Sequence, residues 1–327
     1  MRAVLLDGFG GAEVLRVGDI PIPEPADRHV LIKVRATSIN RPDLVQREGK
    51  YPPPKGESEI LGLEVAGTIE RLGPSVTDYA VGDRVMSLVG GGGYAEYAVA
   101  HSEHLIPIPD SMDFESAAAI CESYITAFLN LYMEARLKDG ETALIHGGGG
   151  GVNTAAVQII RVLSPNSKIM VTHAPEKKAG CRELGIDYLV DYVNEDFLEI
   201  AKTVTANKGM DVILDHVGAA YLGRNMKSLA YGGRLVVIGV VSGIKADLNL
   251  ALMMVKRQRI IGSVLRSRPL EEKTAITAEF KARVLPRLAD GSIVPIIDHV
   301  FGIDDVQEAH KTMEADKHFG KIILLMN

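Results

Sequence analysis

The sequence predicts an α/β protein in which a doubly wound parallel sheet is inserted into a β-rich domain. Three observations predict this arrangement. Strand-like runs broken by proline and glycine fill the first third of the chain, apolar strands alternate with helices from about residue 142, and a helix–strand–helix–strand tail follows residue 271. Apolar strands that alternate with helices are typical of a parallel sheet covered on both faces. At roughly 150 residues per domain, the length also suggests about two domains.

Composition and charge argue against several classes of protein. Hydrophobic residues make up 46% of the 327 residues and charged residues 24%, near the globular average. The net charge of −6 argues against a broad basic surface for nucleic acid or for an anionic membrane. The two cysteines, Cys121 and Cys181, are too few for a disulfide framework or a four-thiolate zinc site. With no apolar run of ~20 residues and no targeting signal, a cytoplasmic protein is expected.

The first third is expected to consist of strands, and a helix follows it. Strands are expected over Met1–Leu6, Val30–Ala36 and Val65–Ile69. The helix is expected from Ser116 to Leu137, where Lys138-Asp139-Gly140 ends it.

The next part of the chain alternates regularly between strand and helix. Strands are expected over Thr142–His146, Lys168–Thr172, Tyr188–Tyr192, Met210–Asp215, Arg234–Gly239 and Ile260–Leu265. Helices are expected over Val152–Val162, Glu176–Leu184, Glu195–Ala206 and Leu250–Lys256.

A run of five glycines, Gly147–Gly151, separates the first strand of this alternation from its first helix. Glycine permits a tight turn and a close approach of backbone to a pyrophosphate, and the helix N-terminus offers free N–H groups. A glycine run alone would also suit a flexible linker. The flanking strand and helix favour a dinucleotide site on Gly148, Gly149, Gly150, Gly151 and Val152.

The end of the second strand indicates which dinucleotide binds. An NAD site places Asp or Glu there to hold the ribose hydroxyls, whereas this chain has Thr172-His173-Ala174-Pro175. Lys177 or Lys178 is suited to a 2′-phosphate, although two lysines on a first helical turn are also common at a surface. The pattern favours NADPH.

Metal and serine-nucleophile chemistry find little support. Among the histidines only His101 and His104 lie close together in sequence, and no cysteine is near them. A catalytic zinc needs three converging protein ligands, so no metal site is expected. The remaining polar candidates are Asn40-Arg41-Pro42-Asp43 and Tyr51, suited to positioning a hydride acceptor and supplying a proton. On local sequence alone, residues 40–43 also fit a capped turn.

Several motifs in order then resemble one family. They are Asn40-Arg41-Pro42-Asp43, Ile60–Gly67, Val81–Val85 and Gly93–Tyr97, followed by the inserted nucleotide domain. The stretches Leu265–Arg268, Glu308–Lys311, Met313–Ala315 and Gly320–Ile322 resemble one member of the family in particular. The chain resembles the zinc-independent quinone oxidoreductases of the medium-chain dehydrogenase/reductase superfamily over essentially its whole length. Zinc-dependent members carry Gly-His-Glu where this chain has Gly62-Leu63-Glu64, and a cysteine where it has Asn40.

The resemblance implies a fold, domain limits and site residues. It implies a β-rich, GroES-like catalytic domain over residues 1–118, an NADPH-binding Rossmann domain over 119–264 and a return to the catalytic domain over 265–327. Asn40, Asp43 and Tyr51 would border the nicotinamide and substrate, and Thr126 would lie near the nicotinamide. Further cofactor contacts would come from His173, Lys177, Tyr192, Ile238, Gly239, Val240 and Leu265. Asn153 stands where relatives have a glycine, and His173-Ala174-Pro175 where they have Ala-Gly-Ser.

The expected function is NADPH-dependent reduction of a small-molecule quinone in the interdomain cleft, without a metal, by a homodimer that does not bind a membrane. One alternative is a reductase of α,β-unsaturated ketones or enoyl thioesters. A non-enzymatic alternative is an NADPH-binding scaffold or RNA-binding protein, for which the only sequence support is the short basic run Lys256–Arg259.

Overall fold

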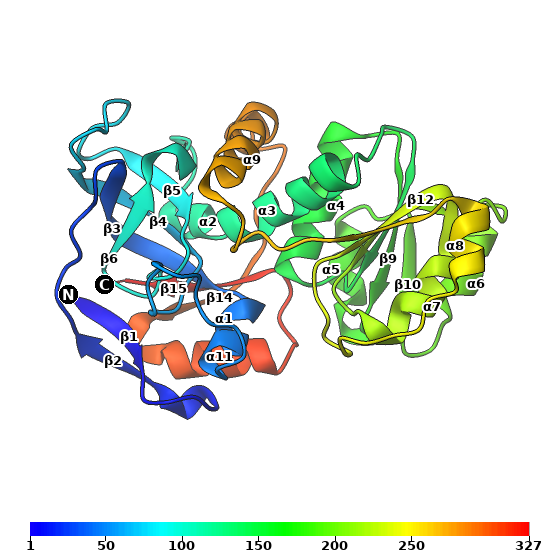
Figure 1. The fold of residues 1–327 in the computed structure, drawn as a ribbon, viewed down its shortest axis with the longest axis horizontal. Helices are drawn as coiled ribbons and strands as arrows, with labels where there is room; N and C mark the ends of the chain where they lie inside the picture. Colours follow the sequence, from blue (N-terminus) through cyan, green and yellow to red (C-terminus); the bar gives the residue numbers. More distant parts are fainter. Residues whose placement is uncertain (327) are drawn as a thin grey trace. The chain divides into compact units, whose positions relative to one another are not determined.

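The structure of the chain, a computed structural model, describes residues 1–326. These residues form two compact units (Figure 1). The split unit consists of Met1–Ile125 together with the segment that begins at Leu265, and the inserted unit consists of Thr126–Val264.

A seven-stranded sheet forms the centre of the split unit, with strands in the order β14-β15-β3-β4-β5-β7 and with β6 paired to β3. Its strands are β3 (His29–Ile39), β4 (Glu64–Leu72), β5 (Arg84–Leu88), β6 (Tyr97–His101), β7 (Leu105–Pro107), β14 (Ile297–Gly302) and β15 (Lys321–Leu325). The C-terminal strand β15 runs antiparallel to β3, with Ile322 opposite Ile39. This pairing brings Lys321, near the end of the chain, beside residues that follow β3.

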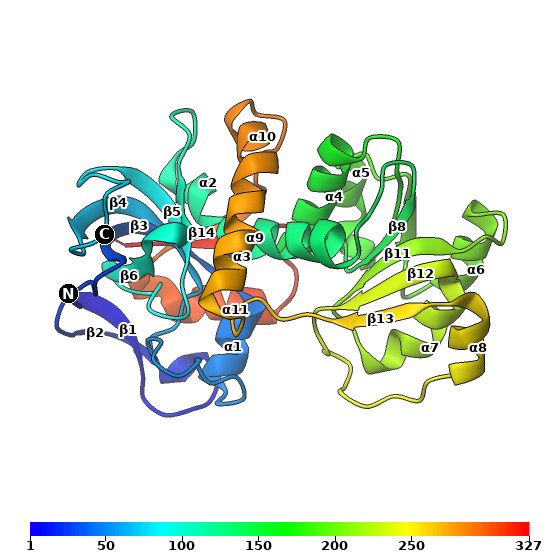
Figure 2. The ribbon, with the colours of Figure 1, turned by 45° about the horizontal axis from the view of Figure 1, so that its top comes forward.

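Shorter elements surround this sheet. They are β1 (Arg2–Leu6), β2 (Leu15–Asp19), α1 (Arg41–Arg47), α2 (Phe114–Ala118), α9 (Leu270–Arg283), α10 (Leu285–Ala289) and α11 (Val306–Glu314). Alternate strand residues pack inward with residues of α11, and the resulting core includes Val30, Ile32, Val65, Ala309 and Ile322. Figure 2 shows α9 beside α10 at the beginning of the returning segment.

The inserted unit contains a six-stranded sheet with all strands parallel, in the order β10-β9-β8-β11-β12-β13. The strands are β8 (Thr142–His146), β9 (Lys168–His173), β10 (Tyr188–Asp191), β11 (Met210–Asp215), β12 (Leu229–Val237) and β13 (Arg259–Gly262). Helices α4 (Gly151–Leu163) and α5 (Lys178–Glu183) cover one face (Figures 1 and 2). The other face carries α6 (Phe197–Val204), α7 (Ala219–Ser228) and α8 (Leu250–Lys256). The predicted fold class, a doubly wound sheet inserted in a β-rich domain, is therefore confirmed.

The long helix predicted from Ser116 to Leu137 is wrong as a single element. The stretch forms α2, then α3 (Cys121–Phe128), then a π-helical segment over Leu129–Glu134. The Asn130 side chain donates to Thr126 O at 2.7 Å within this stretch. Because Asp113 caps α2 through the Ser116 N–H, the first helix also begins earlier than predicted.

Two elements of the inserted unit were not predicted correctly. Strand β12 begins at Leu229, and its register with β11 shifts so that Met210 faces Leu229 whereas Val212 faces Arg234. Gly232, at φ +71, lies in this irregularity. Because glycines inside a strand resemble a turn in the sequence, the strand was predicted to start only at Arg234. Helix α7 was missed because polar residues interrupt its apolar pattern, including the buried Asn225.

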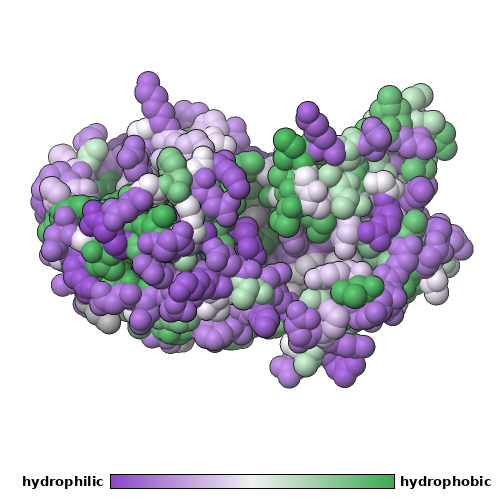
Figure 3. Space-filling model, turned by 90° about the horizontal axis from the view of Figure 1, so that it is seen from below, coloured by the Kyte–Doolittle hydropathy of each residue, from purple (hydrophilic) through white to green (hydrophobic). Residues whose placement is uncertain are grey.

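Hydrophilic side chains, purple in Figure 3, cover most of the face drawn there, with apolar residues exposed between them. Such a mixture is ordinary for a folded protein. Within residues 1–326, no helix combines the length and the apolarity needed to cross a membrane.

Candidate active site

Asn40 and Asp43 lie where strand β3 passes into helix α1. Asn40 is the residue before the helix, and its backbone N–H donates to Asp43 Oδ2 at 2.8 Å. Pro42 occupies the first turn, where its missing N–H costs nothing. The capped turn that the local sequence suggested is thus the N-terminus of helix α1, where Asn40 and Asp43 form a capping box.

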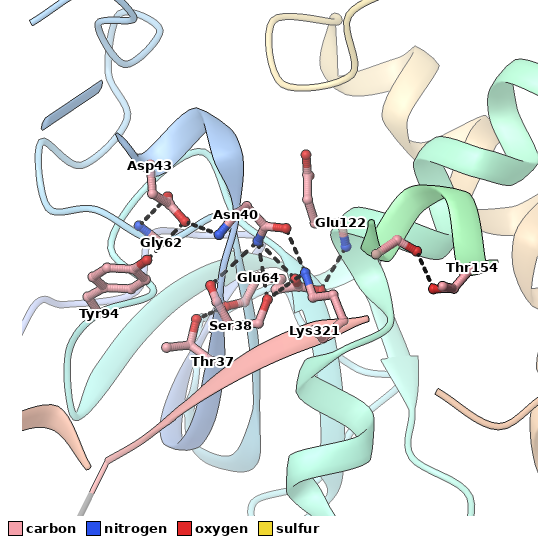
Figure 4. A network of polar contacts seen from close by, with 11 residues as sticks. Thr37, Ser38, Asn40, Asp43, Gly62, Glu64, Tyr94, Glu122, Thr154 and Lys321 are labelled. Carbon is pink, nitrogen blue, oxygen red and sulfur yellow. Dashed lines mark hydrogen bonds and ion pairs between the residues drawn. The ribbon is translucent and has the colours of Figure 1, made fainter. Parts of the chain in front are cut away.

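The side chain of Asn40 belongs to a buried polar network around Glu64 (Figure 4). Lys321 Nζ lies 2.6 Å from Asn40 Oδ1 and 3.0 Å from Glu64 Oε1. Asn40 Nδ2 donates to Glu64 Oε1 at 3.0 Å. The Ser38 hydroxyl donates to the same oxygen. The Glu122 backbone N–H donates to Glu64 Oε2 at 2.8 Å. A buried carboxylate with this many donors and a cation is electrostatically compensated.

The carboxylate of Asp43 is also fully engaged. It accepts hydrogen bonds from the Asn40 N–H, the Gly62 N–H at 3.2 Å and the Tyr94 hydroxyl at 3.0 Å. Desolvation raises the pKa of Asp43 to about 6, against the opposing effect of these hydrogen bonds. Asp43 is completely buried, so the structure places it as a side chain that positions Asn40 and the Gly62 turn.

Tyr51 lies partly buried in the split unit, with the guanidinium of Arg266 5.1 Å from its ring centroid. Burial raises the pKa of the Tyr51 hydroxyl, the charge of Glu122 raises it further and the charge of Arg266 lowers it. Tyr51, Glu122 and Arg266 are therefore electrostatic neighbours.

Four residues of this region were given no role from the sequence: Glu64, Glu122, Arg266 and Lys321. Glu64, Arg266 and Lys321 lie inside motifs that carry the family resemblance. A motif, however, does not show which side chains contact one another. Glu122 had one detectable signal, an acid directly after the apolar run Ala117–Cys121. Glu122 is partly exposed, and acids in mostly buried surroundings are often paired or functional.

The second glycine run, Gly90–Gly93, explains how the segment before β4 packs. A Cβ on Gly91 would lie 2.2 Å from Ser58 O, and one on Gly93 would lie 2.9 Å from Gly62 C. Gly90 O accepts from Arg266 Nε at 2.8 Å and from Nη2 at 2.6 Å. The absence of side chains in Gly90–Gly93 allows this segment to pack directly against the backbone of residues 58–62. It also leaves the Gly90 carbonyl accessible to Arg266.

The glycine loop of the inserted unit has the geometry of an anion cradle. Among the described residues, the N–H groups of Gly149, Gly151 and Val152 have no hydrogen-bond partner, while Gly147 and Gly148 donate to Thr172 O. A Cβ on Gly148 would lie 2.3 Å from Val171 Cγ1. The free amides stand at the N-terminus of the 13-residue helix α4. This arrangement fits a pyrophosphate.

Asn153, which replaces a glycine of relatives, stabilises this loop. Its Nδ2 donates to His146 O at 2.5 Å and to Gly147 O. His146 is completely buried and contacts Thr172 and Asn225 through its two ring nitrogens. The substitution thus adds hydrogen bonds to the carbonyl side of the loop and leaves its free N–H groups in place.

The predicted residues for the adenosine end lie around the end of β9. The strand ends at His173, whose carbonyl accepts from the Tyr192 N–H at 3.2 Å. Lys177 is only 8% exposed, whereas Lys178 is exposed. Tyr192 is 41% exposed. Burial raises the pKa of the Cys181 thiol to about 11, and the charge of Lys177 opposes this shift. Cys181 also borders the glycine loop, since a Cβ on Gly148 would lie 2.9 Å from its Sγ.

The remaining predicted contacts lie in different surroundings. Thr126 Oγ1 is buried and has no hydrogen-bond partner in the described part of the chain. Ile238 and Gly239 follow β12, and Val240 is 48% exposed. Leu265 is buried in the split unit. The Thr126 hydroxyl is therefore able to form a hydrogen bond with a bound ligand.

No group of three or more His, Cys, Asp or Glu side chains among residues 1–326 converges as a metal site would require. His101 and His104 lie with their ring centroids 5.4 Å apart. In the network of Asn40 and Glu64, the central cation is the Lys321 ammonium.

Comparison with known proteins identifies the class first. Residues 26–110 match the alcohol dehydrogenase GroES-like domain, and residues 184–324 match the zinc-binding dehydrogenase family. These matches place the chain among the medium-chain dehydrogenases and reductases. It is 34% identical to human quinone oxidoreductase over 330 residues, covering 100% of this chain and 98% of the relative. The chain belongs to the quinone oxidoreductase family and is an oxidoreductase.

Solved structures agree with this assignment. The structure of Escherichia coli quinone oxidoreductase complexed with NADPH superposes with a TM-score of 0.88 at 26% identity, with 100% of both chains covered. The CurK enoyl reductase has a TM-score of 0.88 at 25% identity, covering 100% of this chain and 99% of the other.

Proposed function

We propose that the protein reduces quinones with NADPH. The observation that carries this proposal is the glycine loop, whose three free amides begin helix α4 in a full-length relative of human quinone oxidoreductase. The Escherichia coli relative was solved with NADPH. The bound dihydronicotinamide would supply the hydride.

The pyrophosphate would be held by the amides of Gly149, Gly151 and Val152. No carboxylate ends β9 to repel a 2′-phosphate, and Lys177, His173 and Tyr192 would form its surroundings. Thr126 would use its unpartnered hydroxyl toward the nicotinamide end. A buried lysine and the absence of the ribose-binding acid support NADPH over NADH.

On the side of the site that binds the electron acceptor, Asn40 would contact the acceptor and Asp43 would hold Asn40 in position. Both side chains are engaged within the split unit, with Asn40 bound to Lys321 and Glu64. Tyr51 would border the acceptor with its ring beside Arg266. Rigid positioning of this kind suits hydride transfer, which needs alignment more than covalent chemistry.

The reaction is proposed to proceed without a metal. The Lys321 ammonium lies between Asn40 and Glu64, and a divalent cation placed there would meet a positive charge. Leu63, beside Glu64, offers no ligand atom. Activity is therefore expected to survive exhaustive treatment with a chelator, and a loss that zinc restores would contradict the proposal.

The direct test is a comparison of NADPH and NADH oxidation across ortho- and para-quinones, enones and enoyl-CoA thioesters. Quinones with NADPH are expected to give the highest kcat/KM. Enoyl thioesters are the second candidate, because the CurK enoyl reductase shares the fold at 25% identity. Preference for enoyl thioesters would replace the first proposal. If NADPH is not oxidised with any acceptor, the result would favour the non-enzymatic alternative, an NADPH-binding scaffold.

The basic run that could support RNA binding is engaged within the chain. Lys256 Nζ donates to Leu229 O at 2.7 Å, and Arg257 lies over the Tyr231 ring at 5.7 Å. Gln258 is buried. These contacts favour the structural interpretation of Lys256–Arg259.

We also propose that the protein is a homodimer joined at strand β13. This strand is an edge of the six-stranded sheet, and edge strands pair readily with a second copy. Exposed apolar residues gather in its neighbourhood, namely Met254, Val255, Ile260 and Val264. Light scattering is expected to give a dimer mass, and Ile260→Lys is expected to give a monomer.

Among the family's members, the motifs Leu265–Arg268 and Glu308–Lys311 favour similarity to the tumour-protein-inducible, apoptosis-associated quinone oxidoreductase.

A further inference from the structure

A polar cavity of about 90 Å³ lies within the split unit. Its lining includes Glu122, Arg266, Lys273, His29 and His104, together with the apolar Leu63. Several polar groups of this lining have no partner, which distinguishes the cavity from a gap in packing.

Arg266 has one guanidinium nitrogen without an acceptor. Nε and Nη2 both donate to Gly90 O, whereas Nη1 has no hydrogen-bond partner in the described chain. The residue is only 8% exposed. Leaving a buried charged donor unsatisfied is costly. The cavity therefore presents a donor suited to an oxygen atom with negative charge.

Glu122 brings a carboxyl group to the same cavity. Its backbone N–H is bound to Glu64, but no side chain or backbone group in residues 1–326 donates to its carboxyl. It forms no ion pair with Arg266 within the described residues, although the two charges interact. The free Nη1 of Arg266 and the carboxyl of Glu122 line one cavity, so a polar group placed there is able to contact both.

The surroundings of Glu122 set its protonation. Desolvation and the charge of Glu64 raise its pKa to about 8, with Asp43 adding to this effect, while Lys321 and Arg266 oppose it. The other titratable groups around the cavity are Glu57, Lys273, His29, His101 and His104, with Cys121 beside Glu122 in sequence and Tyr51 beside Arg266. A raised pKa favours the protonated carboxyl near neutral pH, and a protonated carboxyl can donate.

We propose that this cavity receives the carbonyl oxygen of the electron acceptor, which Arg266 polarises and to which Glu122 delivers a proton. This inference rests on the proposed function and deepens it. It also makes Tyr51 a neighbour of the arginine rather than the proton donor.

The chemistry balances as follows. Bound NADPH would supply the hydride: its C4–H bond would break as a new O–H bond forms on one quinone oxygen. The electron pair that arrives with the hydride would leave a negative charge on the other oxygen of the reduced ring. Arg266 Nη1 donates to that oxygen. The O–H bond of Glu122 breaks, a new O–H bond forms on the ring, and the hydroquinone leaves. The Glu122 carboxylate then regains its proton from solvent.

The cavity's size restricts the class of acceptor. A volume of about 90 Å³ is small beside the ~300–1,000 Å³ of pockets that enclose a whole drug-sized ligand. The cavity therefore suits the carbonyl end of an acceptor rather than the whole molecule.

The first experiment needs neither cofactor nor turnover. 4-Nitrophenol imitates the phenolate formed during reduction, and its ionisation is visible by absorbance. The unsubstituted, cofactor-free protein is expected to lower the pKa of bound 4-nitrophenol, and Arg266→Met is expected to weaken binding of the phenolate about tenfold or more. Arg268→Met, in which the neighbouring arginine is removed, serves as the matched control and is expected to bind normally. Unaltered phenolate binding by Arg266→Met would overturn the proposal, even if quinone reduction were established.

The second experiment tests Glu122 by kinetics. Glu122→Gln is expected to lower kcat about 100-fold at pH 7, within the range for loss of a general acid, and to change the KM for NADPH little. The unsubstituted enzyme is expected to lose kcat as pH rises through about 8, and the variant is expected to lack this dependence. Glu115→Gln, on helix α2, is the control.

Folding is checked independently. Arg266→Lys keeps the charge but not the fork of donors, and Glu122→Asp keeps the acid. Partial recovery of phenolate binding and of kcat in these variants, with unchanged thermal unfolding, would support the roles. If Glu122→Gln keeps full kcat and the same pH profile, Glu122 is not the donor.

Discussion

The ammonium of Lys321 lies 3.0 Å from Glu64 Oε1, joining two residues that are 257 positions apart in sequence. The side chains are 4% and 0% exposed. Strand β15 begins at Lys321 and pairs with β3, so the end of the chain completes a network that begins at Asn40.

Breaking this ion pair is expected to destabilise the protein strongly. Lys321→Met leaves the Glu64 carboxylate buried without its cation and is expected to lower the free energy of unfolding by about 3–5 kcal/mol. Urea denaturation measures this change. The double variant Lys321→Met/Glu64→Gln should recover part of the loss. Lys311→Ala removes an exposed pair with Glu308 and should cost less than ~1 kcal/mol. A loss in Lys321→Met no larger than in Lys311→Ala would contradict this prediction.

Gly148→Ala is expected to impair cofactor binding. The added methyl would lie 2.3 Å from Val171 Cγ1 and 2.9 Å from Cys181 Sγ, so the loop must move away from its position at α4. The KM for NADPH should rise several-fold, with a lower thermal unfolding temperature. Gly223→Ala is the control, because a Cβ there meets nothing within 4 Å and alanine favours a helix by about 1 kcal/mol. Equal KM values in both variants would exclude the loop from the cofactor site.

Lys177→Ala is expected to separate the two cofactors. Loss of the ammonium should raise the KM for NADPH about tenfold and leave that for NADH nearly unchanged, since only NADPH carries the 2′-phosphate. Lys178→Ala tests the adjacent exposed lysine and should change neither. Steady-state kinetics with both cofactors decides the matter, and equal effects on NADPH and NADH would remove Lys177 from the phosphate site.

Substitutions of Tyr51 are expected to distinguish its ring from its hydroxyl. Tyr51→Phe keeps the ring beside Arg266 and should retain most of kcat. In Tyr51→Ala, kcat should fall about tenfold because the guanidinium loses its cation–π contact. Tyr79→Phe removes a hydroxyl that donates to Leu105 O at 3.1 Å and serves as a control. A large loss of kcat in Tyr51→Phe would indicate that the hydroxyl supplies the proton.

Acid should destabilise the protein partly through His310. Burial, together with the charge of Arg47, lowers the pKa of His310 to about 3, so the unfolded chain binds a proton there that the folded chain does not. The stabilising contribution is present above about pH 6.5 and is lost as the pH falls toward 3, by at most about 1.4 kcal/mol per pH unit. His310→Asn should reduce the slope of unfolding free energy between pH 4 and 6.5. His299→Asn, a substitution of an exposed histidine, should leave this slope unchanged. Identical slopes for the unsubstituted protein and both variants would show that His310 does not cause the loss of stability in acid.

The sequence by itself determined the fold class, the glycine loop and the family. Strands β8 and β11 and helix α8 lie where their patterns predicted them, because short apolar runs and helical periodicity are local properties. The motifs also predicted a site at Asn40, Asp43 and Tyr51, and this role stays a prediction. Local pattern failed where helix 116–137 broke into shorter elements and where β12 carries an irregular register.

Only the tertiary structure decided which side chains meet. Lys321 reaches Glu64 through the pairing of β15 with β3, and Arg266 reaches Gly90 and Tyr51 from the returning segment. Desolvation raises the pKa of Glu122, and the charges of Glu64 and Asp43, from other elements, raise it further. Desolvation and charge coupling depend on distances across the folded chain, and sequence spacing does not contain those distances.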